Sequence, residues 1–118
     1  MKAMYLLAGF ILMCAAPLAF AATEPTSVAI EKFAFAPREI TIAPGTTVVW
    51  SNHDETPHTL IATDGSFVSR AMDTDDRYEH TFAAPGDYNY FCTLHPFMTG
   101  VVHVRADPAV ADTTRKGG

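Results

Sequence analysis

Short runs of β-branched and aromatic residues recur about every ten residues from Val28 onward, with turn residues between them. The turn signals include Pro44-Gly45, Asp64-Gly65 and Pro85-Gly86. No stretch after the N-terminus repeats apolar residues with the three-to-four-residue period of a long helix. The spacing therefore predicts an all-β domain, built as a sandwich or barrel. The expected strands are 28–30, 33–35, 40–42, 46–50, 58–62, 78–82, 88–92 and 101–104, and 67–77 is expected to be a loop with at most one helical turn.

The N-terminus has the layout of a secretory signal peptide. Lys2 precedes an apolar run, and Ala19-Phe20-Ala21 supplies a small-residue cleavage site. The run is too short for a bilayer-spanning helix, and nothing later in the chain approaches the roughly 20 residues required. We expect a signal peptide at 1–21, one domain at 22–106, a flexible tail at 107–118, and a periplasmic location. A lipidated Cys14 is the alternative, although the bulky Met13 before it disfavours that reading.

Charge and cysteine content narrow the function further. The 118 residues hold 13 acidic and 8 basic side chains, a net charge of −5 that becomes −6 once Lys2 is removed with the signal. An acidic chain lacks the basic footprint of a nucleic-acid binder. Loss of Cys14 would leave Cys92 as a lone thiol in an oxidising compartment, without a disulfide partner. Such a thiol is either buried and inert or held by a metal.

The neighbours of Cys92 favour the metal. Cys92, His95 and Met98 follow one another at three-residue intervals between two expected strands, so a tight loop there brings all three side chains together. A second imidazole is expected from another loop, at His58 after Pro57, with His53 as the alternative. Met72 is the alternative to Met98.

Two histidines, one cysteine and one methionine suit a particular metal. Two imidazoles and a thiolate in a trigonal plane, with a weak axial thioether, form the blue-copper electron-transfer arrangement. Zinc is the rival, but structural zinc sites usually take four Cys or His ligands. We therefore expect one type 1 copper ion held by His58, Cys92, His95 and Met98.

An ordered set of short motifs resembles the cupredoxin family, and most closely its amicyanin-like branch. The motifs are Phe33-x-Phe35-x-Pro37, Pro44-Gly45, Trp50-x-Asn52-x-Asp54, Pro57-His58, Phe67-x-Ser69, Pro85-Gly86-x-Tyr88-x-Tyr90, Cys92-x-x-His95-Pro-x-Met98 and Gly100-x-Val102-x-Val104. The resemblance implies a Greek-key β-sandwich of seven or eight strands with copper at one end. It also implies an electron carrier whose redox partners are a quinoprotein dehydrogenase and a c-type cytochrome. The segment before Phe33 is shorter than in amicyanins, so an N-terminal strand is expected to be short or absent.

The resemblance further implies a brace between the ligand loops, a hydrogen bond from Asn52 to Thr93, in keeping with the general need for support around metal ligands. Pro57, Pro96 and Phe97 are expected to surround the His95 edge with an apolar patch for partners. The acidic segment (Asp73, Asp75, Asp76 and Glu79) is a solvated face or a steering surface for a basic partner. The remaining expectations concern single side chains: Phe35, Trp50, Phe82, Tyr88 and Tyr90 in the core, and His80 and His103 in solvent.

Two other functions fit parts of the pattern. A copper carrier or storage protein would favour labile sites rich in Met and His, whereas this chain offers one compact donor set. A copper oxidase or nitrite reductase needs further histidine clusters, and five histidines in one domain do not supply them. We therefore expect an electron carrier, not an enzyme, acting as a monomer.

Overall fold

The computed structural model describes residues 24–106, which form eight strands and no helix. The strands are β1 (Thr26–Glu31), β2 (Ala34–Ala36), β3 (Glu39–Ile42), β4 (Thr46–Asn52), β5 (Ile61–Ala62), β6 (Arg77–Phe82), β7 (Gly86–Phe91) and β8 (Thr99–Val104). The signal peptide expected at 1–21 and the tail expected at 107–118 lie outside the described residues. Among the described residues, no helix is long and apolar enough to cross a membrane.

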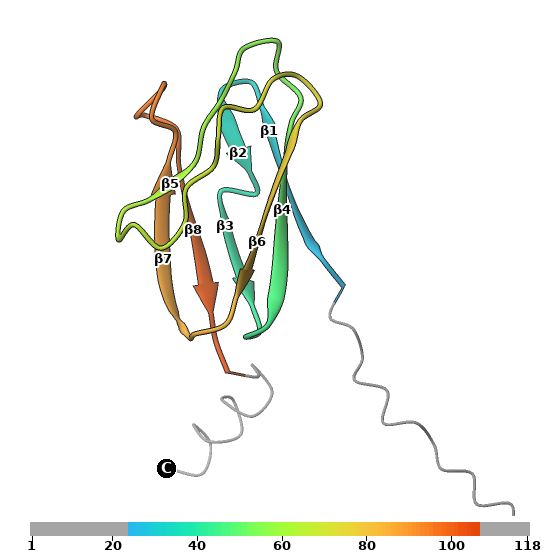
Figure 1. The fold of residues 1–118 in the computed structure, drawn as a ribbon. Coiled ribbons are helices and arrows are strands. Elements are labelled where there is room, and N and C mark those ends of the chain that lie inside the picture. Colours follow the sequence, from blue (N-terminus) through green and yellow to red (C-terminus); the bar gives the residue numbers. More distant parts are fainter. Residues whose placement is uncertain (1–23, 107–118) are drawn as a thin grey trace, which may run out of the picture.

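The strands form two four-stranded sheets that face each other as a sandwich (Figure 1). One sheet has the order β2-β1-β4-β6 and the other β3-β8-β7-β5. Each sheet contains one parallel pair, β1 with β4 and β3 with β8, and the other pairings are antiparallel. The all-β prediction and the expected cupredoxin-type sandwich are confirmed.

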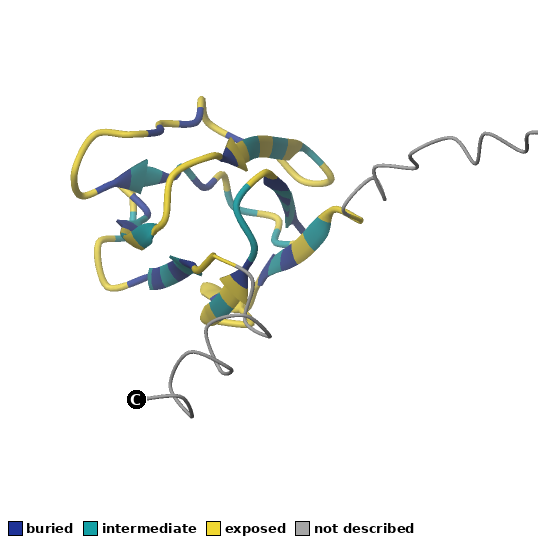
Figure 2. Cartoon of the chain, turned by 90° about the horizontal axis from the view of Figure 1, so that it is seen from below, coloured by how far each residue is buried: buried dark blue, intermediate teal, exposed yellow. Residues whose placement is uncertain are grey.

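Strand alternation builds the core between the sheets. Buried and half-buried residues alternate without a break along β4 and β8, and Figure 2 shows the strands banded by burial, with exposed residues in the bands of some strands. Period-two alternation places every second side chain on the inner face. The predicted core aromatics are confirmed: Phe35, Trp50, Phe82 and Tyr90 are buried, and Tyr88 packs against them.

One hydrogen bond across the core joins the two sheets. Trp50 of β4 donates its indole N–H to the Tyr90 hydroxyl of β7 at 3.1 Å, so both polar tips are satisfied inside the core. Burial raises the pKa of Tyr90 to about 12 despite the Trp50 hydrogen bond, which keeps the phenol neutral as an acceptor. On β8, a Cβ at Gly100 would lie 2.4 Å from the Tyr90 ring, so only glycine fits there.

The segment 58–62 is less regular than the sequence predicts. Only Ile61 and Ala62 form a strand, and His58 pairs with Met72 as an isolated bridge. The reason lies in the segment that faces it: the N–H of Leu60 donates to the Ser69 hydroxyl at 2.8 Å instead of to a backbone carbonyl. A hydrogen bond to a side chain therefore replaces one backbone hydrogen bond of the strand pairing. His58 lies in a loop rather than in a strand. The predicted loop at 67–77 is confirmed up to residue 76, and Arg77 begins β6.

Candidate metal centre

The loop between β7 and β8 carries three of the four predicted ligands. The backbone N–H of His95 bonds the carbonyl of Cys92 at 3.2 Å, and the N–H of Met98 bonds the carbonyl of His95 at 2.8 Å. The N–H of Cys92 closes the loop on the carbonyl of Met98 at 3.1 Å. These turns hold the backbone of Cys92 beside that of Met98, and both residues are buried. The short spacing in sequence thus becomes a compact loop, as predicted.

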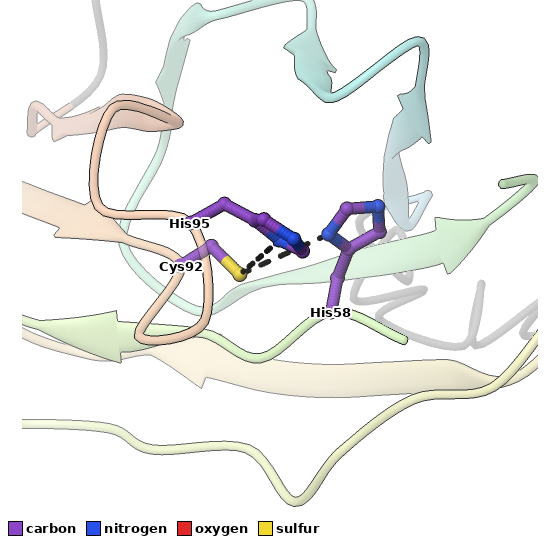
Figure 3. A group of neighbouring side chains, drawn as sticks. All are labelled: His58, Cys92 and His95. Atoms are coloured by element: carbon purple, nitrogen blue, oxygen red, sulfur yellow. Dashed lines mark hydrogen bonds between the residues drawn. The ribbon is translucent and has the colours of Figure 1, made fainter. Parts of the chain in front are cut away.

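His58 arrives from the loop after β4 and meets this group at the end of the sandwich. The Sγ atom of Cys92 lies 3.8 Å from Nδ1 of His58 and 3.7 Å from Nδ1 of His95. Figure 3 shows both rings turning these nitrogens toward the sulfur. Cys92 and His58 are both 0% exposed, and His95 is half-buried. Within residues 24–106, these are the His, Cys and acidic groups that could hold a metal ion together.

The donor spacing fits a single ion among the three side chains. With metal–sulfur and metal–nitrogen bonds of about 2.3 and 2.0 Å, trigonal coordination places sulfur and nitrogen about 3.7 Å apart. The two measured separations match that value. One soft thiolate with two imidazoles suits copper, and Met98 is the thioether on the same loop.

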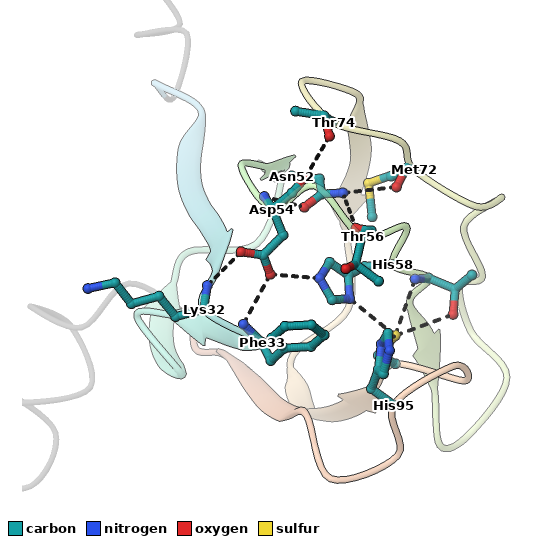
Figure 4. A network of polar contacts seen from close by, with 11 residues as sticks. Lys32, Phe33, Asn52, Asp54, Thr56, His58, Met72, Thr74 and His95 are labelled. Atoms are coloured by element: carbon teal, nitrogen blue, oxygen red, sulfur yellow. Dashed lines mark hydrogen bonds and ion pairs between the residues drawn. The ribbon is translucent and has the colours of Figure 1, made fainter.

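Asp54 supports His58 from the side away from the sulfur. Its carboxylate accepts the Nε2–H of His58 at 2.8 Å, and it also accepts the backbone N–H groups of Lys32 at 2.7 Å and Phe33 at 3.0 Å (Figure 4). Desolvation raises the pKa of Asp54, but the hydrogen bonds from Phe33, His58 and Lys32 outweigh it, and the pKa is lowered overall. The group is therefore an ionised acceptor at neutral pH.

The predicted Asn52–Thr93 brace is wrong. The buried amide of Asn52 donates to the carbonyls of Thr56 and Met72, both at 3.0 Å, and its oxygen accepts the N–H of Asp54 at 2.9 Å. Both amide protons are used within the His58 side of the site, so Asn52 has no donor left for Thr93. Its role is to join the 53–57 loop to the segment that contains Met72.

Thr59 forms the tie between the ligand loops instead. Its hydroxyl accepts the backbone N–H of Thr93 at 2.9 Å and makes a short hydrogen bond with the Thr93 hydroxyl. Its backbone N–H points at Sγ of Cys92 at 3.4 Å, where it would stabilise a thiolate. The bridge therefore reaches Thr93 as expected, but it starts one residue after His58 rather than six residues before it.

The residues predicted for the apolar patch lie at the surface, and two of them, Pro96 and Phe97, directly follow His95 in the sequence. Pro57, Pro96 and Phe97 are all exposed, and Phe97 is 71% exposed. The Phe97 ring lies 6.0 Å from the His95 ring, centroid to centroid. Phe33, from the turn between β1 and β2, approaches His95 more closely, at 5.1 Å and edge-on.

The alternative ligand candidates lie elsewhere. His53 is exposed, and Met72 is buried in the core with its backbone paired to His58. His80 and His103 are half-buried, not fully solvated as predicted. His80 contacts the Phe67 and Phe82 rings, and burial lowers its pKa.

His103 belongs to a polar cluster on β3, β7 and β8. It bonds Asp87 at 2.6 Å and forms a short bond with Glu39, and both carboxylates raise its pKa, Asp87 more strongly. Arg105 pairs with the same Asp87 oxygen at 2.6 Å.

Sequence reasoning missed three residues of the site: Phe33, Asp54 and Thr59. Asp54 carries a usable signal, because it lies four residues before His58 and ligand histidines give their second N–H to a carboxylate, a backbone carbonyl or water. Thr59 directly follows His58 in the sequence, so its position beside a predicted ligand is a second usable signal. Phe33 offers no such signal, since its position depends on a turn whose two residues both have positive φ.

A comparison with protein-family models matches residues 22–105 to the copper-binding proteins of the plastocyanin/azurin family. An amicyanin from Paracoccus versutus is 42% identical over 82 residues, covering 65% of this chain and 62% of that protein. Amicyanin-alpha from Methylorubrum extorquens is 37% identical over 84 residues, covering 67% of this chain and 71% of that protein. The chain thus spans less than two thirds of the first of these relatives.

Solved structures with the same fold include copper proteins of different size. The M98A variant of amicyanin in its Cu(I) form superposes with a TM-score of 0.66 at 30% identity, covering 69% of this chain and 82% of that one. A copper-containing nitrite reductase from Thermus scotoductus has a TM-score of 0.65 at 31% identity, but only 22% of its chain is covered.

Proposed function

Because the chain belongs to the plastocyanin/azurin family of copper-binding proteins, we propose that it is a blue-copper electron carrier. Copper would take up and release single electrons by alternating between Cu(II) and Cu(I). The observation that carries the proposal is the spacing of Sγ of Cys92 from Nδ1 of His58 and of His95, at 3.8 and 3.7 Å. Met98 on the same loop completes the proposed ligand set.

The surroundings of these ligands suit electron transfer more than turnover of a substrate. A rigid sandwich with two tied loops changes little when the charge of a bound ion changes, so reorganisation is small. The matched region covers only 22% of the nitrite reductase chain. Electron carriage without chemistry on a substrate is therefore the proposed role.

Electrons are proposed to enter and leave through His95. The half-buried ring lies beside Pro96 and Phe97, with Leu94 54% exposed on the same loop and Phe33 42% exposed beside it. Exposed apolar patches of this kind commonly mark partner contacts, and small interfaces suit brief redox encounters. The partners proposed from the amicyanin resemblance are a dehydrogenase as electron donor and a c-type cytochrome as acceptor.

Two further features belong to the proposal. Residues 1–21 would export the chain to the periplasm, where Cys92 would be protected by its metal. The acidic segment would steer a basic partner toward the copper end, because its loop contacts the loop before His58: the N–H of Asp75 bonds the carbonyl of Asn52 at 2.7 Å.

Addition of Cu(II) to the metal-free protein tests the proposal. The expected result is an intense blue thiolate-to-copper absorption band that is lost on reduction and returns on oxidation. Loosely held copper without that band would contradict the electron carrier and favour copper delivery. A Cys92→Ser variant is the control and should bind no blue copper.

The electron port is tested by self-exchange between reduced and oxidised copies, which needs no partner. Phe97→Glu places a negative charge beside His95 in both copies, so self-exchange measured by NMR line broadening should slow at least tenfold with an unchanged copper spectrum. The matched control is Val68→Glu, because Val68 is 63% exposed but lies on the loop after β5. Equal rates in the two variants would contradict the port.

A further inference from the structure

The carboxylate of Asp54 connects two parts of the molecule that are distant in sequence. Oδ2 receives both the Nε2–H of His58 and the N–H of Phe33, and Oδ1 receives the N–H of Lys32 (Figure 4). Asp54 is itself held at both ends of its backbone, because its N–H bonds the Asn52 amide oxygen at 2.9 Å and its carbonyl accepts the Thr74 hydroxyl at 2.7 Å. The position of the carboxylate is therefore determined before any metal binds.

The first consequence concerns the His58 ring. Both carboxylate oxygens already accept a backbone N–H group, so Asp54 acts as an acceptor toward His58 as well, and Nε2 of His58 carries the proton of that hydrogen bond. In the neutral ring, Nδ1 then carries no hydrogen and has a lone pair free for a metal. This is the atom that lies 3.8 Å from Sγ of Cys92. With the ring fully buried, Asp54 selects both the tautomer and the orientation needed for metal binding.

The second consequence concerns the β1–β2 turn. Lys32 and Phe33 have φ values of 54° and 56°, which residues with a Cβ rarely adopt. Their two consecutive N–H groups both end on the Asp54 carboxylate. The turn held in this way places the Phe33 ring edge-on to His58 at 5.5 Å and to His95 at 5.1 Å. One carboxylate thus orients a ligand and fixes the aromatic ring that lies against both histidines.

We propose that Asp54 is a positioning residue of the copper centre, which sets the balance between Cu(II) and Cu(I) by making the His58 imidazole a stronger donor. The inference rests on the proposed function, since it concerns the same site. A carboxylate on the second nitrogen raises the basicity of a ligand imidazole. Its negative charge also favours the more positive oxidation state, so it should lower the reduction potential.

The test compares Asp54→Asn with Asp64→Asn. The first substitution keeps the shape of the side chain but removes its charge and one acceptor. Asp64 is the matched control, because it is an exposed aspartate that also accepts a backbone N–H, from Ser66 at 2.9 Å. Loss of outer support typically costs about 10- to 100-fold in metal affinity. We expect that loss for Cu(II) in Asp54→Asn, with a smaller loss for Cu(I), and hence a raised midpoint potential.

A second readout needs no copper. Amide hydrogen exchange of Lys32 and Phe33 in the metal-free protein should accelerate at least tenfold in Asp54→Asn and stay unchanged in Asp64→Asn. If the wild-type protein fails to form a blue centre, the proposed function fails, while the exchange rates still decide whether Asp54 holds the turn. If the wild type forms a blue centre, and Asp54→Asn has the same reduction potential and the same Cu(II) affinity as Asp64→Asn, the positioning role of Asp54 is overturned.

Discussion

The two histidines beside Cys92 occupy opposite environments. His58 is completely buried, and Asp54 holds its far nitrogen at 2.8 Å. His95 is half-buried, lies 5.1 Å from the Phe33 ring and 6.0 Å from the Phe97 ring, and belongs to a loop on which Leu94 and Phe97 are exposed. Under the proposed function, this difference would divide the work at the site: one side would hold the metal in place, and the other would present it to partners.

Removing each histidine in turn should give the largest effect and directly tests the difference between the two environments. His95→Gly should lose the blue band and regain it when imidazole is added, because the vacated position opens to solvent. His58→Gly should lose the band without regaining it, because the vacated position is enclosed. Absorption titrations with imidazole measure both, and equal rescue of the two variants would contradict the difference in access.

The buried side should also contribute more stability than the tie between the loops. Asn52→Ala leaves the Thr56 carbonyl and the Asp54 N–H without their partner and removes one of two hydrogen bonds to the Met72 carbonyl, at a cost of about 2–4 kcal/mol. Thr59→Val removes its bonds to Thr93, which water replaces at that exposed residue, at a cost of about 1 kcal/mol. Urea unfolding of the metal-free variants measures both values. A larger loss for Thr59→Val would reverse the ranking.

The smallest expected effect is a dependence of folding stability on pH, which arises in the β7–β8 hairpin that carries the His95 loop. Asp87 on β7 and His103 on β8 pair at the end of the hairpin away from Cys92. Asp87 and, less strongly, Glu39 raise the pKa of His103. Its contribution to the stability of the folded protein is therefore complete below about pH 6.5 and is lost as the pH rises through the raised pKa. The pKa of Asp87 is lowered, chiefly by His103 and then by Arg105, so its stabilisation is present above about 3.8 and is lost as pH falls through the lowered pKa.

The expected result is a small extra stability between these limits, which His103→Gln removes. Melting temperatures measured across that range in the wild type and the variant test it, with Cys92 left unmetallated in both. Because the variant keeps every other side chain, the rest of the pH dependence cancels in the difference. Parallel pH profiles for the two proteins would show that the cluster contributes nothing.

The sequence predicted the ligand loop well because its information is local. Three donors at three-residue intervals between two strands have few ways to fold, and the turns at His95 and Met98 are of the expected kind. His58 was also expected beside Cys92, since it ends a turn-rich segment at the same end of the sandwich. The coordinates place the donor atoms of His58, Cys92 and His95 within 4.8 Å of one another.

The prediction failed where a polar side chain had several possible partners in the folded protein. Asn52 was expected to reach Thr93, but two carbonyls nearer to it in space use both of its amide protons. His103 was expected in solvent because alternation turns it outward, yet carboxylates on the two neighbouring strands partly cover it. Alternation tells which face a residue occupies and says nothing of its neighbours on that face.

The amino-acid sequence by itself determined the strand pattern and the chemical identity of the donors, because both depend on residues close together in the chain. The tertiary structure alone decided which groups support those donors. Asp54 meets Lys32 across 22 residues, and Thr59 meets Thr93 across 34. Such contacts depend on how two sheets pack and how a left-handed turn is oriented, and the free energy that selects them belongs to the whole fold and not to any short segment.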